Sequence, residues 1–216
     1  MKKKLINLLG GLLISFGLLI VVGSVVLNLE QRAMQKEAIN EFKQMVLDSK
    51  EAPLKEDKPL NEETGNDEAT EDIKGDLAAD VSVNTGDILY ILRIPTIESE
   101  SPVREGVSDG VLADSLGHEP DTALVGEVGN CVIAGHRNYS FGKYFNRLNE
   151  VKTGDYIYVD TKDATYKYEV YDIIVVKPDD LSVLDNTDEE ELTLYTCTPV
   201  VIGTHRLVVK SKRVGE

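Results

Sequence analysis

The stretch that decides the fold is residues 165–176, which read TYKYEVYDIIVV. Tyr166, Tyr168 and Val170 alternate with polar or charged residues, and this is the period of a strand with one buried face. Aromatic and β-branched residues of this kind are favoured in strands. The stretch therefore predicts a long, half-buried β-strand.

Runs of the same character lie on both sides of this stretch and are separated by turn residues. They cover residues 88–94, 130–134, 156–159, 192–196 and 204–210. Between them, residues 141–148 gather four apolar side chains on one helical face and predict a short helix: Phe141, Tyr144, Phe145 and Leu148. We expect residues 86–216 to form one all-β domain, closed as a mostly antiparallel barrel with one or two short helices.

The N-terminal part of the chain has the composition of a membrane anchor. Lys2, Lys3 and Lys4 precede an uncharged, mostly apolar run at residues 5–29, which is long enough to cross a bilayer as one helix. Because cytoplasmic flanks carry the excess of lysine and arginine, residues 1–4 are expected inside the cell and everything after the run outside it. The run is longer than the apolar part of a signal peptide, and no Ala-x-Ala site follows it. We expect an uncleaved, single-pass anchor in the cell membrane with an extracellular domain.

Two polar segments separate this anchor from the barrel. Residues 30–50 predict a stalk helix, because apolar side chains recur at steps of three and four: Met34, Ala38, Phe42 and Met45. Residues 51–85 follow, and from Glu51 to Asp80 eleven acidic residues stand against three lysines. Such a composition buries too little apolar surface to fold, so we expect a disordered acidic linker rather than a segment that binds calcium or the cell wall.

The formal net charge of the chain is −15. Nucleic-acid binding uses clustered lysine and arginine to displace counterions from phosphates, so this charge argues against a nucleic-acid partner. The chain has two cysteines, which is too few for a disulfide scaffold but enough for one disulfide in an exported protein. Each cysteine therefore has to be assigned from its position.

His136 and Cys197 both stand where a predicted strand ends. His136 follows the run 130–134 and Gly135, and Cys197 closes the run 192–196 just before a proline turn. A lone histidine at such a place is more often a polar turn residue bonded to the backbone. An accessible cysteine at an equivalent position favours a catalytic role for both.

Cys131 has two roles open to it, as half of a disulfide with Cys197 or as a buried apolar residue. Side chains alternate along a strand, so Cys131 and His136, which are five residues apart, face opposite sides if the strand is unbroken. A bulge at Gly135 would reset this phase. The alternation favours a buried Cys131, and the disulfide stays the alternative.

Arg206 lies near the start of the run 204–210, which the short loop 198–203 joins to the cysteine run. In such a hairpin, the residue that closes one strand lies close to a residue near the start of the next. We expect Cys197 and Arg206 to flank one substrate carbonyl, with a surface ion pair as the ordinary alternative for a single arginine. Two other histidines are expected away from the site: His205, which alternates with Arg206, and His118, in a loop with a structural role.

Cysteine, histidine and arginine together serve acyl transfer. The thiolate of Cys197 attacks an amide carbonyl, Arg206 stabilises the oxyanion, and the His136 imidazolium protonates the departing amine. A metal site is the competing use of cysteine and histidine, but the β-rich half has no Cys-x-x-Cys, no His-x-x-x-His and no dense ligand cluster. We expect a cysteine acyltransferase that needs no metal or other cofactor.

At these residues the sequence resembles the sortase family. Residues 193–197, TLYTC, resemble the family's Thr-Leu-x-Thr-Cys signature, and residues 132–137, VIAGHR, resemble its histidine motif. Arg206 follows at a family-like spacing, and the similarity runs from about residue 88 to residue 214. The resemblance implies an eight-stranded β-barrel.

The resemblance also implies a transpeptidase that cleaves surface proteins at a Leu-Pro-x-Thr-Gly-like sorting signal, between Thr and Gly. The enzyme would hold the protein as a thioester on Cys197 and pass it to a cell-wall amine of a peptidoglycan precursor. His136 and Arg206 carry over as general acid/base and oxyanion partner. Further residues are expected to position the substrate or line its groove: Thr196, Ala134, Ile133 and the loop residue Val201.

Several alternatives within and beyond this family stay open. Pilus-assembling members commonly carry a lid with an Asp-Pro-aromatic motif and a second membrane helix, and residues 81–88 and 210–216 contain neither. This favours a class D, single-anchor enzyme, with a pilin-polymerising class C enzyme, a hydrolytic endopeptidase or a non-catalytic binding domain as alternatives. Some relatives bind calcium near the acidic residues that crowd positions 179–191 here, and we interpret that segment as a solvated loop.

Overall fold

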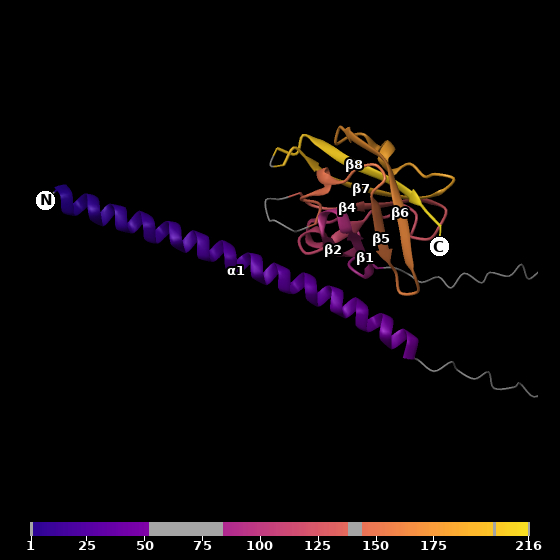
Figure 1. Cartoon of the computed structure of the whole chain (residues 1–216), viewed down its shortest axis with the longest axis horizontal. Helices are drawn as coiled ribbons and strands as arrows, with labels where there is room; N and C mark the ends of the chain where they lie inside the picture. Colours follow the sequence, from indigo (N-terminus) through magenta and orange to yellow (C-terminus); the bar gives the residue numbers. More distant parts are fainter. Residues whose placement is uncertain (1, 52–83, 138–143, 201, 216) are drawn as a thin grey trace, which may run out of the picture.

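The computed structural model describes residues 2–51, 84–137, 144–200 and 202–215. A long N-terminal helix, α1 (Lys2–Glu51), lies beside a closed eight-stranded barrel (Figure 1). Side chains of α1 are described from Gly10 to Asp48, except at residues 28, 31 and 32. The predicted acidic linker falls mostly on residues 52–83, which are outside the described residues.

The eight strands form one sheet that closes on itself. They are β1 (Ile88–Ile94), β2 (Ser99–Glu105), β3 (Leu116–His118), β4 (Gly129–Ala134), β5 (Tyr156–Asp160), β6 (Thr165–Val176), β7 (Glu190–Thr198) and β8 (His205–Arg213). Their order around the barrel is β1-β2-β3-β4-β7-β8-β6-β5, with β5 paired to β1. The β2/β3 and β4/β7 pairs are parallel and the other six are antiparallel. The predicted all-β, eight-stranded, mostly antiparallel barrel is confirmed.

The alternating pattern of β6 produces the barrel interior. Tyr168 and Val170 are each 1% exposed and belong to the main apolar cluster, together with alternate residues of other strands such as Leu192 and Leu194 of β7. β4 differs because all six of its residues are buried. The connection between β6 and β7 covers the outer face of β4 at its N-terminal end, where Asn130 donates hydrogen bonds to the carbonyls of Val183 and Asp185. The first partly exposed residue after β4 is His136, just beyond the C-terminal end of the strand.

Two strands and one helix differ from the sequence prediction. β2 and β3 were not predicted, because β2 is mostly polar and contains Pro102, and β3 has only three residues. His118 consequently lies in a strand and not in a loop. The described part of the predicted helix 141–148 is a turn at residues 144–147, followed by a 3₁₀ helix, η2 (Leu148–Glu150). The other short helices are η1 (Pro95–Ile97), α2 (Asp109–Leu112) and η3 (Leu181–Leu184).

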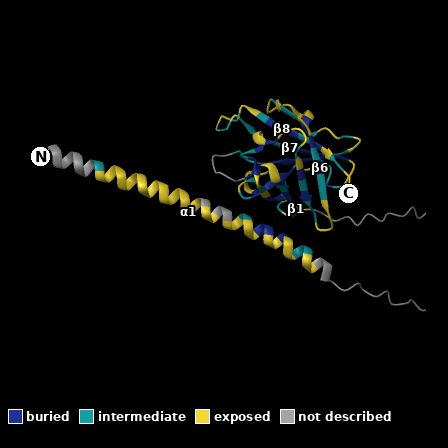
Figure 2. Ribbon diagram, viewed as in Figure 1, coloured by how far each residue is buried: buried dark blue, intermediate teal, exposed yellow. Residues whose placement is uncertain are grey.

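Helix α1 covers both the predicted anchor and the predicted stalk without a break. Residues 10–27 form an apolar stretch long enough to cross a membrane, and all of it is exposed or nearly so. Farther along, Ala38, Ile39 and Phe42 are buried against Ile88 and Ile91 of β1. Figure 2 shows this change along the helix, from exposed residues to a buried patch beside the barrel. The predicted apolar stripe is therefore the face that docks, except at Met34, which is 47% exposed.

Candidate active site

The candidate site lies at one end of the barrel, where β4 and β7 finish and β8 begins. Cys197 is paired with Arg206 in the β7/β8 ladder. In the parallel β4/β7 ladder Ala134 is paired with Tyr195, and the Gly135 N–H continues the ladder with a 3.1 Å bond to the Tyr195 carbonyl. The same register, extended by two residues on each strand, brings His136 level with Cys197. His136, Cys197 and Arg206 thus form one row across three adjacent strands, about 4.8 Å from strand to strand.

Cys197 and Arg206 also share one face of the sheet, and His136 follows directly after the end of β4. Cys131, Ile133 and Leu194 belong to the barrel core, so the residues that alternate with them, including Ala134 and Cys197, face outward. His136, Cys197 and Arg206 are each partly exposed. The predicted opposition of Cys131 and His136 stays a prediction, because His136 lies beyond the last residue of β4. The row is open to a substrate.

Two side-chain hydrogen bonds brace the His136–Cys197 junction from either side. The Thr196 hydroxyl donates to the Gly135 carbonyl at 2.6 Å, which ties the residue before the cysteine to the residue before the histidine. Arg137 donates through Nη1 to the Thr198 hydroxyl at 2.9 Å, which ties the residue after the histidine to the residue after the cysteine. Burial lowers the pKa of the Arg137 guanidinium from its ordinary value. These bonds fix the relative position of the two strand ends.

Arg206 is held against the loop that joins β7 to β8. Its Nη1 donates to the carbonyls of Gly203 and His205, each at 3.2 Å. A guanidinium has five N–H donors, more than these two bonds use. Gly203 has φ +62°, a left-handed conformation, and a Cβ built there would lie 3.9 Å from Cys197 Sγ. The loop therefore folds back closely over the cysteine.

Tyr195 and Glu119 add a polar pair to the same outer face, which the sequence analysis missed. The Tyr195 hydroxyl donates a hydrogen bond to Glu119 Oε1. Burial, and then the hydrogen bond to Glu119, raise the pKa of the Tyr195 phenol. Glu119 follows β3, so the phenol reaches across β4, where Ala134 is small enough to leave room. The strand alternation that places Cys197 on the outer face also places Tyr195 there, so the sequence pattern could have identified Tyr195 as a residue of this face.

The two cysteines have opposite surroundings. Both are free, so they do not form a disulfide in this structure. Cys131 is 2% exposed in the core, and burial raises the pKa of its thiol far above the ordinary range. Cys197 is partly exposed at the strand end. Only Cys197 is placed where a thiolate can meet a substrate.

The residues expected to contact substrate fall in different places. Ala134 is on the outer face, 2% exposed, beside Tyr195. Ile133 is completely buried in the barrel core, so the expectation that it lines a groove is wrong, because it has the opposite strand parity. Thr196 faces inward and bonds to the backbone instead. Val201 lies outside the described residues.

The other two histidines are occupied elsewhere. His118 is 2% exposed, with Nδ1 2.8 Å from Glu105 Oε2 and Nε2 3.1 Å from the Thr122 hydroxyl, which supports the predicted structural role. His205 is exposed and bonds to Thr204. Among the residues with described positions, no three His, Cys, Asp or Glu side chains are grouped to hold a metal ion.

Comparisons with known proteins agree with this site. The sortase domain family matches residues 92–214. Sortase D of Bacillus subtilis is 32% identical over 169 residues, covering 76% of this chain and 82% of that protein. Sortase SrtE1 of Streptomyces coelicolor is 32% identical over 151 residues, covering 62% of this chain and 43% of that protein, so the chain spans less than half of this longer relative.

Solved structures give the same result. A Clostridium perfringens Sortase D5 transpeptidase superposes with a TM-score of 0.64 at 29% identity, covering 85% of this chain and 99% of that one. Sortase A from Corynebacterium diphtheriae superposes with a TM-score of 0.58 at 35% identity, covering 61% of this chain and 62% of that one. Similarity to proteins named sortase D is consistent with the expected class.

Proposed function

Because the chain belongs to the sortase family of cysteine transpeptidases, we propose that it cleaves a Leu-Pro-x-Thr-Gly-like sorting signal between Thr and Gly and joins the surface protein to a cell-wall amine. The observation that carries this proposal is the single row of His136, Cys197 and Arg206 on the open end of the barrel face. A non-catalytic binding domain would not need these three groups side by side.

The first half of the reaction forms a thioester. The Cys197 thiolate attacks the carbonyl carbon of the signal's Thr, and the carbonyl oxygen becomes an oxyanion. Arg206, directly across the ladder from Cys197, donates N–H groups to that oxygen. The His136 imidazolium gives its proton to the Gly nitrogen as the Thr–Gly bond breaks. The amine leaves, and the protein remains bound to Cys197 through its Thr.

The second half reverses these roles. An acceptor amine from a peptidoglycan precursor attacks the thioester carbonyl, and neutral His136 takes the proton that the amine loses. The C–S bond breaks, a new amide bond forms, and the thiolate and imidazolium are restored. The balance requires no oxidant, reductant or metal ion. Water attacking in place of the amine would give the hydrolytic alternative.

The N-terminal helix supports an extracellular site. Sortases are anchored in membranes, and α1 carries an apolar stretch at residues 10–27 that can serve as the anchor. Lys2, Lys3 and Lys4 precede this stretch, and the positive-inside rule then puts the barrel outside the cell. The proposed partners are surface proteins with a C-terminal sorting signal, and the similarity to sortases named D favours a single-anchor enzyme over a pilin polymerase.

The test is mass spectrometry of the full-length protein in detergent with a Leu-Pro-x-Thr-Gly peptide library and several amines. We expect a thioester adduct on Cys197, cleavage between Thr and Gly, and a ligated product when triglycine or a diamino acid is added. Ample hydrolysis without ligation to any amine would replace the transpeptidase by an endopeptidase. Cleavage that survives the Cys197→Ala substitution would remove the proposed mechanism altogether.

A further inference from the structure

The docked part of α1 runs along the barrel in a defined direction. Gln35 donates to the carbonyl of Glu100 at 2.7 Å and to the hydroxyl of Ser101 at 3.1 Å, near the turn between β1 and β2. Ten residues later, Met45 lies in a hollow lined by Ile88, at the opposite end of β1. The helix therefore passes from the Ile94–Ser99 end of this hairpin to the Ile88 end.

The end that the helix meets first is the catalytic end. The turn after β1 is connected to the catalytic end by Arg147, which donates a hydrogen bond to the Ile97 carbonyl at 3.0 Å. The neighbouring Asn149 accepts from Arg137 at 2.7 Å, and Arg137 binds Thr198 beside the nucleophile. Figure 1 shows the same direction, because β8 begins, and the β7–β8 loop projects, on the side of the barrel nearer the N-terminus of α1. The catalytic end thus faces the apolar span.

The distance along α1 is short. Gln35 lies eight positions after Leu27, the last residue of the apolar stretch 10–27. At 1.5 Å per residue this is about 12 Å along the helix axis, and a headgroup layer is about 5–8 Å deep, so Gln35 lies just outside that layer. An exposed apolar side chain stands at this end, since Ile202 in the β7–β8 loop is 71% exposed.

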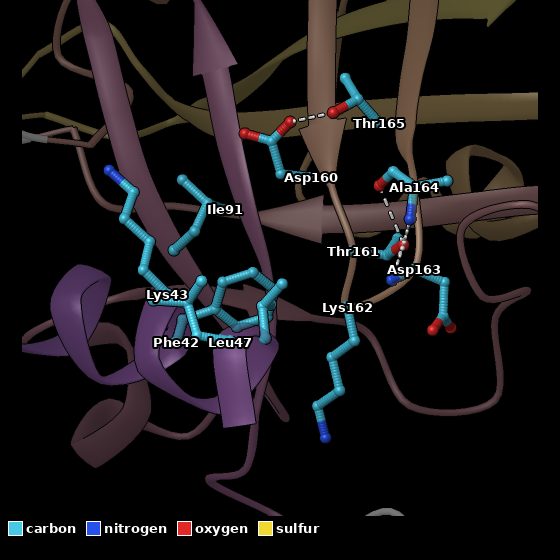
Figure 3. Close-up of a pocket in the computed structure, with 11 residues that line it drawn as sticks. Phe42, Lys43, Leu47, Ile91, Asp160, Thr161, Lys162, Asp163, Ala164 and Thr165 are labelled. Atoms are coloured by element: carbon cyan, nitrogen blue, oxygen red, sulfur yellow. Dashed lines mark hydrogen bonds between the residues drawn. The ribbon is translucent and has the colours of Figure 1, made fainter. Parts of the chain in front are cut away.

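Apolar packing holds the helix in this position. Phe42 is 2% exposed against Ile91, whereas the ion pair of Lys43 with Glu100 is solvent-exposed and contributes little. Figure 3 shows Phe42 and Leu47 on one side of a cavity of about 570 Å³ and the turn between β5 and β6, Thr161 to Ala164, on the other. Ala38 and Ile39 are buried in the same apolar cluster, and Phe42 is the most deeply buried of the three, so a charge at position 42 should disturb the docking strongly.

We propose that the docking of α1 on β1 and β2 holds the catalytic end of the barrel against the lipid headgroup layer, with Ile202 in contact with the membrane surface. This rests on the proposed function only in taking α1 as the anchor. The consequence is a preference for substrates whose scissile bond lies within a headgroup depth of the bilayer. A polypeptide held in the membrane just beyond its sorting signal meets this condition, and an amine on a lipid-linked acceptor meets it as well.

The test of geometry uses the full chain in vesicles of phosphatidylglycerol and phosphatidylethanolamine, some of them labelled with a nitroxide on the headgroup. In a Cys197→Ala background, a fluorophore is attached at Ile202→Cys or, as the matched control, at Lys162→Cys in the exposed β5–β6 turn at the far end. We expect strong quenching at position 202 and little at position 162. Equal quenching at the two positions, or stronger quenching at 162, overturns the proposal.

The test of the docking contact is Phe42→Asp, compared with Asn40→Asp on the exposed side of the same helix. Phe42→Asp places a charge in the apolar seam, and we expect it to reduce quenching at position 202 to the level at 162. With Cys197 intact, cleavage of a soluble signal peptide should stay unchanged, and cleavage of a membrane-held substrate should fall about 10-fold. An unchanged rate on the membrane-held substrate overturns the proposal. Loss of soluble-peptide cleavage in the unsubstituted chain would instead count against the proposed function, and the quenching result would still stand.

Discussion

The two ends of the β4/β7 pair are built from the same two strands and serve different purposes. At the N-terminal end of β4, Asn130 accepts a 2.7 Å hydrogen bond from Thr193 and donates two hydrogen bonds to the β6–β7 connection, and both residues are buried. At the other end, Thr196 makes a similar bond to the Gly135 carbonyl, but the strands then stop and leave His136 and Cys197 partly exposed. Similar strand-to-strand bonding thus gives a closed structural end and an open reactive end.

The same contrast between a closed end and an open end explains why one cysteine is accessible and the other is not. Cys131 is 2% exposed and inward on β4, and burial raises the pKa of its thiol. Cys197 is outward and close to a guanidinium, paired with Arg206, at a position that solvent and substrate can reach. Strand parity and distance from the strand end therefore decide which cysteine reacts.

The comparison of the two cysteines gives the largest predicted effect. We expect Cys197→Ala to lower kcat/KM for a sorting-signal peptide by at least about 10³-fold, because no other group replaces the nucleophile. Cys131→Ala should retain near-normal kcat/KM and lose roughly 1–2 kcal/mol of stability to the cavity that it leaves. Both variants are measured by peptide cleavage and by urea unfolding. A comparable loss of activity in the two would contradict the assignment of Cys197 as the nucleophile and Cys131 as a core residue.

The second prediction compares Arg206 with Lys210, another basic residue on the same face of β8. Arg206→Gln should lower kcat/KM by about 10²-fold, since it removes a charged donor to the oxyanion. Lys210→Gln, four residues along β8 and opposite Thr193 at the closed end, should change it by less than about twofold. Steady-state kinetics at one pH suffice. An Arg206→Gln variant with unaltered kcat would limit this residue to a structural role.

The two buried threonines give a closely matched and smaller test. Thr196→Val and Thr193→Val each remove one hydroxyl hydrogen bond between β7 and β4, and each should cost about 1–3 kcal/mol of stability. Only Thr196→Val should also lower kcat, by about 10-fold, because it loosens the strand end that carries His136. A Thr196→Ser variant, which keeps the hydroxyl, should recover most of the rate. Equal kcat in the two valine variants would show that the brace is only structural.

The sequence predicted those parts of the fold that alternate strongly, and those parts of the site that strand parity controls. Six of the eight strands carry apolar or aromatic runs, whereas β2 is polar with Pro102 and is paired with β3 only from Val103 onward, where the proline does not interrupt the ladder. His136, Cys197 and Arg206 were predicted side by side because each lies at the end of such a run. The expectation that Ile133 lines the groove was wrong because, by the same alternation, Ile133 points into the barrel core.

Contacts between side chains that are distant in sequence could not be predicted from the periodicity of the sequence. Nothing in the segment around Glu119 indicates that it pairs with Tyr195, and nothing at Arg137 indicates that it reaches Thr198, because both contacts depend on how β3, β4 and β7 are ordered in the barrel. That order has two parallel pairings, β2 with β3 and β4 with β7, which local periodicity cannot specify. The docking face of α1 was predictable as a stripe, but its partner strand was not.

The smallest predicted effect is a pH dependence of stability that comes from the buried cysteine. Burial raises the pKa of the Cys131 thiol, so the folded protein keeps a proton that the unfolded chain releases. The stabilisation is complete below the unfolded pKa, about 8.5, and it is lost as the pH rises above that value, by up to about 1.4 kcal/mol per pH unit for one proton. Urea unfolding between neutral pH and mildly alkaline pH should show this fall, together with the parallel effect of the buried tyrosines at higher pH. Cys131→Ala should make the fall less steep near the thiol pKa, because it removes the thiol that burial keeps protonated in the folded protein, and an equally steep fall in this variant would contradict the prediction.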